Sequence, residues 1–254
     1  MIRGRHTSTQ ETHREDQGRR FRMSSSHMKR LTMPRSWPLP RKSSIWIQKP
    51  NPCGHPLDKC MPLGVILRDV LGVAQNKREA KKIAHSRQVK VDGELETDIG
   101  RGVGLMDVLT VGENNYRCIL DTNGKLRYRP ISAKDASTKY CRVTGKTTIK
   151  GGKTQLHLHD GRNIIFDENP EYRTGDSVVI SLPDQEIKSH HKFEEGSLAY
   201  LTGGNHIGEM ATVKGHEIKR SSKANEVQFD EFGTIADYVF VVSSESDVPK
   251  EDRS

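Results

Sequence analysis

The sequence predicts an α+β protein of several small domains that is mostly β-sheet after a short helical region. Three observations lead to this fold class: helical spacing of apolar residues over 63–85, short β-segments separated by turn residues from 113 onward, and recurring glycines among apolar strands over 196–216. Only 33% of the 254 residues are hydrophobic, so we expect two or three compact domains rather than one large core.

The composition limits the compartment and the partners. The chain has 41 Lys and Arg against 33 Asp and Glu, and the resulting charge of +8 favours a polyanionic partner. No apolar run approaches the ~20 residues of a membrane helix, and no hydrophobic signal core begins the chain, so we expect a cytoplasmic protein. The cysteines form no C-x-x-C pair, and free thiols suit them better than a metal; they are Cys53, Cys60, Cys118 and Cys141.

The N-terminal part of the chain divides into two segments. Residues 1–27 are polar and are expected to be a disordered extension. Residues 28–60 are rich in proline, lysine and arginine, which indicates an extended basic arm rather than a helix. Trp37 and Trp46 lie in this arm, where they are available to stack on a ligand or to pack. A loose linker that binds nothing is the alternative.

Residues 61–112 are expected to form two helices and a hairpin. Pro62 suits the start of the first helix, and Gly72 is placed to end it. Between them, one apolar stripe consists of Leu63, Ile66, Leu67, Val70 and Leu71. After the second helix, a strand over 89–91 leads into a tight turn at Asp92-Gly93.

The second helix is basic where a helix normally avoids positive charge. Asn76 can cap it, and Glu79 three residues later completes a capping box. Lys77 and Arg78 lie in the first turn, against the positive end of the helix dipole, at a cost of roughly a few tenths of a kcal/mol each. A bound phosphate would reverse this cost, since the free N–H groups and both cations would attract it. The basic side continues with Lys81, Lys82 and His85. An ordinary solvated amphipathic helix is the alternative.

The rest of the chain has a β pattern. Asn123-Gly124 predicts a hairpin, and the even spacing of further short strands predicts a small barrel or sandwich over residues 113–190. These strands are expected over 140–143, 154–158, 162–166 and 177–182.

A separate glycine-rich unit is expected over residues 191–242, with strands at 198–201, 211–213 and 239–242. Gly203 and Gly204 would permit positive φ in its first loop, so that Asn205 and His206 reach outward. Residues 243–254 are polar and are expected to be a disordered tail.

These segments resemble known RNA-binding modules. Residues 61–112 resemble the α-L motif, a helix–helix–hairpin fold of ribosomal proteins and pseudouridine synthases, and residues 196–216 resemble a KOW motif, the core of an SH3-like barrel. The order of arm, α-L fold, β-rich domain and KOW barrel is similar to that of the archaeal and eukaryotic small-subunit ribosomal protein S4e family. The residues that carry the resemblance are Leu31-Thr32, Pro34-Arg35-Ser36-Trp37-Pro38, Pro62-Leu63-Gly64, Leu67-Arg68-Asp69, Arg78-Glu79-Ala80-Lys81-Lys82-Ile83 and Val103-Gly104-Leu105-Met106-Asp107-Val108.

The resemblance implies a structural component of the small ribosomal subunit, in the cytoplasm, that contacts ribosomal RNA and neighbouring ribosomal proteins. It implies no catalytic role, no small-molecule substrate, no cofactor and no membrane. By position it suggests RNA contacts in the arm, the basic helix and the glycine-rich loop. These expected RNA-binding residues are Arg35, Trp37, Arg41, Lys42, Asn76, Lys77, Arg78, Lys81, Lys82, His85, Arg87, Gly203, Gly204, Asn205, His206 and Gly208.

Two other functions use the same modules. The chain could be an RNA-modification enzyme, or a translation or transcription factor that docks on structured RNA. The sequence has no P-loop, no H-E-x-x-H helix and no G-x-S-x-G elbow. His157 and His159 alternate on one expected strand, but such a pair is more typical of surface or core histidines than of a metal or base site.

The N-terminus departs from the family pattern. Members of the family usually begin near the equivalent of Lys29-Arg30-Leu31, so residues 1–22 are extra. We expect either that Met23 is the true start or that the leader is a dispensable tail.

Overall fold

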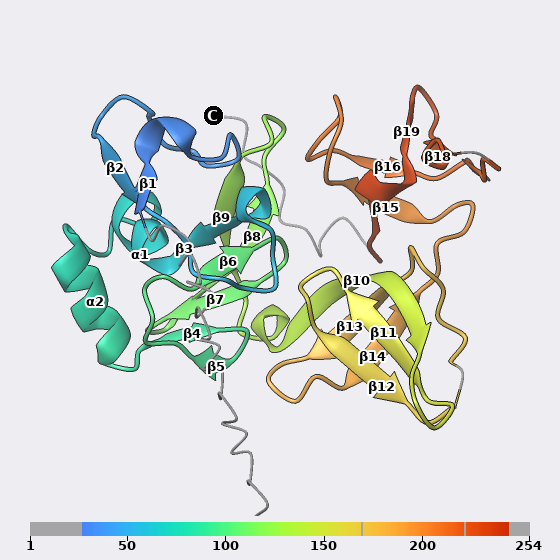
Figure 1. The fold of residues 1–254 in the computed structure, drawn as a ribbon, viewed down its shortest axis with the longest axis horizontal. Coiled ribbons are helices and arrows are strands. Elements are labelled where there is room, and N and C mark those ends of the chain that lie inside the picture. The colour runs from blue at the N-terminus through green and yellow to red at the C-terminus, as the bar shows by residue number, and fades with distance from the viewer. Residues whose placement is uncertain (1–26, 169, 221, 244–254) are drawn as a thin grey trace, which may run out of the picture.

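The protein is a mixed α+β structure, mostly sheet, in the computed structural model shown in Figure 1. The structure describes residues 27–168, 170–220 and 222–243. The expectations for residues 1–26 and 244–254, including the proposed start at Met23, lie outside the described residues.

The N-terminal segment folds onto the protein, which corrects the expectation of an extended arm. Strand β1 (His27–Lys29) pairs antiparallel with β2 (Trp46–Gln48), and the 3-10 turn η1 (Arg30–Thr32) begins the connection between them. His27, assigned to the disordered extension, is therefore part of a strand. The arm folds because it carries apolar side chains that enter the first core, namely Met28, Met33, Trp37 and Ile47.

The first helix forms where expected, but most of it is π-helical rather than α-helical. After the 3-10 turn η2 (Leu57–Lys59) and strand β3 (Cys60–Pro62), α1 (Leu63–Val65) continues into a π-helical turn, η3 (Ile66–Val70). The Leu71 N–H donates to the Ile66 carbonyl at 2.9 Å, five residues back. Gly72 follows with φ of 66°, which confirms it as the residue that ends the helix.

The first sheet has the strand order β5-β4-β7-β8-β9 and is antiparallel throughout. Its strands are β4 (Val89–Val91), β5 (Glu94–Leu95), β7 (Val108–Val111), β8 (Asn114–Leu120) and β9 (Leu126–Ile131), while β6 (Gly102–Gly104) pairs with β3. Asp92 and Gly93 have φ of 52° and 83°, as expected of the tight turn. The sheet crosses the expected domain boundary at 112/113, because the short Gly112-Glu113 turn makes β7 and β8 neighbours.

The second sheet has the order β12-β11-β10-β13-β14. After the 3-10 turn η4 (Asp135–Ser137) come β10 (Thr138–Thr148), β11 (Thr154–Leu158), β12 (Asn163–Phe166), β13 (Ser177–Ser181) and β14 (Ile187–His191). The four strands expected in this region are thereby confirmed. Alternate side chains of β10, β11 and β13 build a core of their own that includes Cys141, Val143, Leu156 and Val178.

The C-terminal strands form two three-stranded sheets. One has the order β16-β15-β20, from β15 (Leu198–Leu201), β16 (Met210–Thr212) and β20 (Val239–Val241). The other has the order β17-β18-β19, from β17 (Gly215–Glu217), β18 (Glu226–Gln228) and β19 (Gly233–Ile235), with the 3-10 turn η5 (Ala236–Tyr238) after it. A core that includes Ala199, Leu201, Val227 and Phe229 lies between them.

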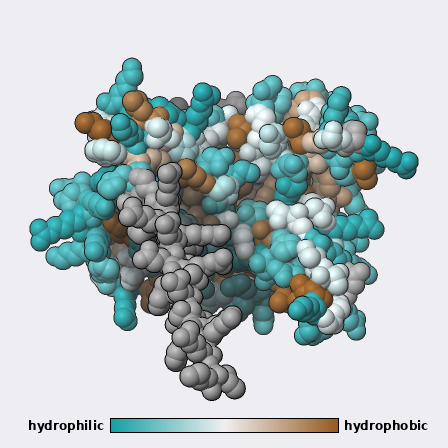
Figure 2. All heavy atoms as spheres, viewed as in Figure 1, coloured by the Kyte–Doolittle hydropathy of each residue, from teal (hydrophilic) through white to brown (hydrophobic). Residues whose placement is uncertain are grey.

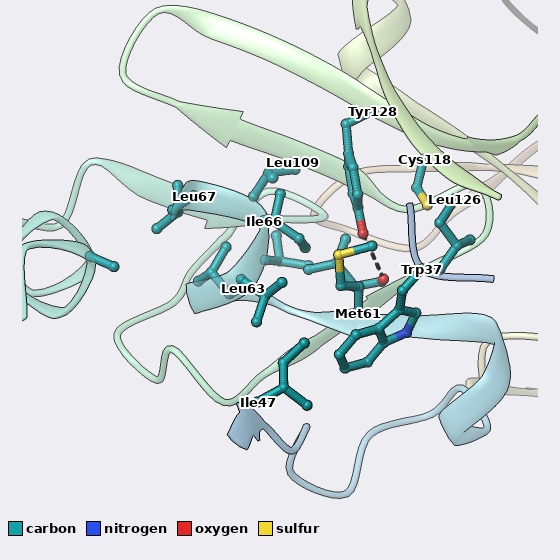
Figure 3. Packing of buried hydrophobic residues seen from close by; sticks show 14 of the residues in the cluster. Trp37, Ile47, Met61, Leu63, Ile66, Leu67, Leu109, Cys118, Leu126 and Tyr128 are labelled. Carbon is teal, nitrogen blue, oxygen red and sulfur yellow. Dashed lines mark hydrogen bonds between the residues drawn. The ribbon is translucent and has the colours of Figure 1, made fainter. Parts of the chain in front are cut away.

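The first core joins the N-terminal segment to the helices and the first sheet. In Figure 3 the indole of Trp37 lies beside Met61, and Tyr128 reaches into the same region from the sheet. The Trp37 side chain is 1% exposed, and its N–H donates to the Cys60 carbonyl at 2.8 Å. Trp37 therefore packs in the core, and the expectation that it contacts RNA is wrong.

A buried ionic cluster joins the two large sheets and the N-terminal segment. The Lys139 ammonium, 1% exposed on β10, lies 2.8 Å from Asp92, 2.6 Å from Asp107 and 2.8 Å from Asp160. We call these four residues, together with Arg162 and His55, the Lys139 cluster. Arg162 lies 2.8 Å from Asp92, and His55 lies 2.9 Å from Asp107.

The charges of this cluster stabilise one another. Burial opposes the charged form of Lys139, but the carboxylates of Asp107 and Asp92 outweigh it and raise its pKa well above the ordinary value. Burial likewise opposes the charge on Asp107, and Lys139 and His55 nevertheless lower its pKa. The pKa of Asp160 is also lowered, because Lys139 outweighs the effect of burial. Folding therefore brings Lys139, Asp107 and Asp160 together as ions, whereas burial and the neighbouring Asp107 raise the pKa of Asp92.

Removing the central cation should unfold the protein more easily. Lys139→Met would leave buried carboxylates without their main partner, at a cost of about 3–5 kcal/mol in the free energy of unfolding. Lys90→Met, an exposed lysine on β4, should change that free energy by less than about 0.5 kcal/mol. Urea unfolding measures both variants, and equal stability of the two would contradict the assigned role of the cluster.

The stability difference between the wild type and Lys139→Met should depend on pH. In the wild type, the folded pKa values of Asp107 and Asp160 lie below the ordinary 3.8, so their stabilisation is present above about pH 4 and is lost as the pH falls further. Without Lys139, both carboxyls lose the cation that chiefly lowers their pKa values, so these values rise relative to the wild type and the folded variant takes up protons at higher pH. Unfolding at about pH 6 and about pH 3 should show the difference shrinking, whereas a constant difference would refute this explanation.

Candidate nucleic-acid interface

Helix α2 (Lys77–His85) forms as expected and presents a basic surface. The Asn76 side chain accepts the Glu79 N–H at 3.0 Å, which caps the helix. The Glu79 carboxylate accepts the Gln75 N–H at 2.8 Å, one residue earlier than a capping box predicts. Ala80 and Ala84 are buried on the inner side of the helix.

The basic side chains of α2 all face solvent. They are Lys77, Arg78, Lys81, Lys82 and His85, and within the part of the chain that the structure describes none of them has a salt bridge or a side-chain hydrogen bond. Arg87 follows the helix with φ of 60° and is also exposed. In Figure 1, α2 lies at the left edge of the molecule, and Figure 2 shows hydrophilic side chains over this edge. An anion at this surface would find cations without a competing partner.

A groove of about 800 Å³ runs between α2 and the β1–β2 hairpin, and we call it the α2 groove. Lys77, Lys81 and His85 line its helical side, and His27 and Trp46 line its hairpin side. The Trp46 side chain is 55% exposed. Trp46 is therefore the more accessible of the two tryptophans, although the sequence favours Trp37 as the RNA contact. The alternation in β2 was the available signal, since Ile47 is buried and its neighbour must point the other way.

The other expected contacts in the N-terminal segment have different surroundings. The side chains of Arg35 and Lys42 are exposed. The backbone carbonyl of Arg35 accepts a hydrogen bond from the Lys125 ammonium. Arg41 is half-buried, and its guanidinium donates to the Leu31 carbonyl at 2.8 Å. Arg35 and Lys42 are therefore open to a ligand, whereas Arg41 is already bound within the segment.

The glycine-rich loop between β15 and β16 differs in part from its prediction. Gly204 and Gly208 have φ of 86° and 82°, whereas Gly203 does not have positive φ. A Cβ on Gly203 would lie 2.5 Å from a ring carbon of Tyr238, so packing is what requires glycine there. Asn205 is exposed at the tip.

The His206 side chain already has two partners near the loop. Its ring stacks on Phe232 with centroids 3.8 Å apart, and its Nδ1 lies 2.8 Å from the Glu209 carboxylate. Strands β15 and β16 and helix α2 lie at opposite ends of the view in Figure 1. The structure thus separates the expected RNA-binding residues into at least two surfaces.

The histidines noted in the sequence have internal partners. His157 lies 2.9 Å from the Thr147 hydroxyl and 2.6 Å from the Asn163 side chain. His159 approaches Cys141 and Asp160 closely enough for a metal site, but its ring nitrogens already contact the Arg142 N–H and the Leu105 carbonyl, each at 3.2 Å. Burial lowers the pKa of His159 to about 4, so this ring is neutral.

The four cysteines are free thiols, and the sulfurs of Cys53 and Cys60 lie 3.8 Å apart. Among the described residues, no helix has the length and apolar character that a membrane crossing requires.

Comparisons with known proteins place this architecture in one family. The model described as Ribosomal family S4e matches residues 112–187, and an RS4NT domain model matches residues 22–58. The small ribosomal subunit protein eS4 of Methanocaldococcus jannaschii is 42% identical over 88% of this chain and 96% of its own, and that of Archaeoglobus fulgidus is 42% identical over 89% and 97%. The crystal structure of the 30S ribosomal protein S4e from Thermoplasma acidophilum has a TM-score of 0.65 and 34% identity, and the match covers 74% of this chain and 97% of that one. The chain therefore belongs to the ribosomal protein S4e family.

Proposed function

We propose that this protein is a structural, non-enzymatic constituent of the small ribosomal subunit that binds ribosomal RNA through phosphate contacts. Relatives that are 42% identical to this chain over 88% and 89% of its length are named as proteins of that subunit. The structural observation that supports the RNA contact is the surface of α2, where five basic side chains have no acidic partner among the described residues. Its place of action is then the ribosome in the cytoplasm, beside neighbouring ribosomal proteins.

The physical basis of the contact is charge neutralisation at a helix start. Lys77 and Arg78 stand next to the free N–H groups of the first turn of α2, where phosphate oxygens are bound well. Lys81 and Lys82 extend the positive surface by one turn. Phosphate contacts fix a protein's orientation on RNA without reading its sequence, which suits a structural component.

We also propose a division of the chain into the modules that the sequence suggests. The helices, the β4–β5 hairpin and β7 would be the α-L fold, with β8 and β9 extending its sheet. The strands from β15 to β20 would be an SH3-like KOW barrel, and their common core supports this assignment. Asn205 would then be the RNA contact of the loop, since it is exposed at the tip.

Charge reversal on α2 tests the RNA contact. A variant with glutamate at the four positions Lys77, Arg78, Lys81 and Lys82 should bind small-subunit ribosomal RNA more weakly. A plot of the log of the association constant against log salt concentration has a negative slope. The magnitude of this slope should decrease by roughly 3, because each lost phosphate contact removes somewhat less than one unit. Binding titrations between about 50 and about 200 mM salt give both quantities.

A matched control separates this surface from the overall charge. It carries the same change at four exposed cations around the second sheet, namely Lys134, Lys150, Arg173 and Lys188. It should keep a larger affinity and a steeper salt slope than the α2 variant. Identical salt slopes for the α2 variant and the wild type would reject α2 as the RNA surface.

Sedimentation tests the structural role in cells. The protein should sediment with small ribosomal subunits at about one copy per subunit, since a fixed component is bound in every particle. Quantitative immunoblotting across a sucrose gradient measures this ratio. A protein found mainly in the free fractions would favour an RNA-modifying enzyme or a factor instead.

A further inference from the structure

The two sides of the α2 groove differ in chemistry. The hairpin side offers an aromatic ring, because Trp46 is 55% exposed and contacts His27 only edge-on, with centroids 5.9 Å apart. The helical side offers Lys77, Lys81 and His85. A flat ring facing a row of cations is the combination by which proteins hold single-stranded nucleic acid.

The cations of this groove lie in one row. Lys77, Lys81 and His85 are spaced four residues apart, so their Cα atoms follow the helix axis at intervals of about 6 Å. Arg78 and Lys82 are each rotated by about 100° from this row and are not among the lining residues of the groove. The four cations that the sequence grouped together therefore belong to two different stripes of α2.

The charge and size of the groove suit a nucleotide. Four of its lining side chains are lysine or arginine, of which Arg68 is paired with Asp69 at 2.6 Å, and Asp98 is the single acid among the described residues that line it. The Asp98 carboxylate is occupied, since it accepts the Asn51 side-chain amide at 2.6 Å and the Gly100 N–H at 2.8 Å. A volume of about 800 Å³ is within the range of small-ligand sites.

We propose that the α2 groove binds an unpaired nucleotide of ribosomal RNA, with its base on Trp46 and its flanking phosphates on Lys77 and Lys81. This inference rests on the proposed function and narrows it to a bulged or single-stranded segment. A base inside a regular RNA helix is stacked on both faces and cannot cover a side-chain ring, whereas an unpaired base can.

Tryptophan fluorescence reports this contact directly. The protein has two tryptophans, of which Trp37 is 1% exposed and Trp46 is 55% exposed, so a ligand in the groove alters the emission of Trp46. The probes are a 12-nucleotide oligoadenylate and a 12-base-pair RNA duplex, each added to the full chain at low salt. We expect the oligoadenylate to quench the emission and the duplex to leave it nearly unchanged.

Substitution of the ring separates stacking from charge. Trp46→Leu keeps an apolar residue on β2 but removes the aromatic face, and it should weaken oligoadenylate binding about tenfold while changing duplex binding less than about twofold. Trp46→Phe should restore most of the affinity. Unchanged oligoadenylate affinity in Trp46→Leu would overturn the proposal.

Two charge variants distinguish this inference from the function on which it rests. Lys77→Glu with Lys81→Glu should weaken oligoadenylate binding more than Arg78→Glu with Lys82→Glu, although both carry the same charge change on the same helix. Equal effects on oligoadenylate, with duplex binding weakened in both, would reject the groove and leave the phosphate contact of α2 standing. If neither variant altered binding of either RNA, the proposed function itself would fail.

Discussion

The attraction between Lys139 and the carboxylates around it links the N-terminal segment to the two large sheets. Asp92 and Asp107 come from the turns of the first sheet, and Lys139 and Asp160 from the second. His55 brings in the N-terminal segment through Asp107. Buried charges are stable only when each is matched, so separating these parts would leave buried carboxylates without their cation. Tyr140 and Tyr200 share an apolar core with Ile119 of the first sheet, and the Tyr200 hydroxyl donates to the Leu120 carbonyl at 2.7 Å, which reinforces this arrangement.

The first apolar core shapes the surface that we propose for RNA. Because Trp37 and Ile47 enter the first core, the β1–β2 hairpin is held beside α2 rather than left extended. The entropic cost of ordering this segment, roughly 1–2 kcal/mol per residue, is therefore met during folding and not on binding. A groove with fixed sides results, so the RNA that we propose for it would meet a preformed surface.

The sequence predicted the elements well and their surroundings less well. Helical spacing, the Asn76 cap and the Asp92-Gly93 turn located α2 and the first hairpin, because each depends on neighbouring residues alone. The strands of the second sheet were found for the same reason. The continuation of the first sheet across residue 112 was missed, since a change in pattern does not show which strands pair. The π-helical turn after α1 also left no mark in the apolar spacing.

What the sequence determined by itself is the position and basic character of α2, the strands of the second sheet and the family, because these follow from local pattern and motif. Only the tertiary structure decided that Trp37 is buried and Trp46 exposed, and that Lys77 and Arg78 face different surroundings. It also decided that Lys139 is an internal ion. The physical reason is that burial and ion pairing arise between residues far apart in the chain, and a side chain's type does not show which partner it meets on folding.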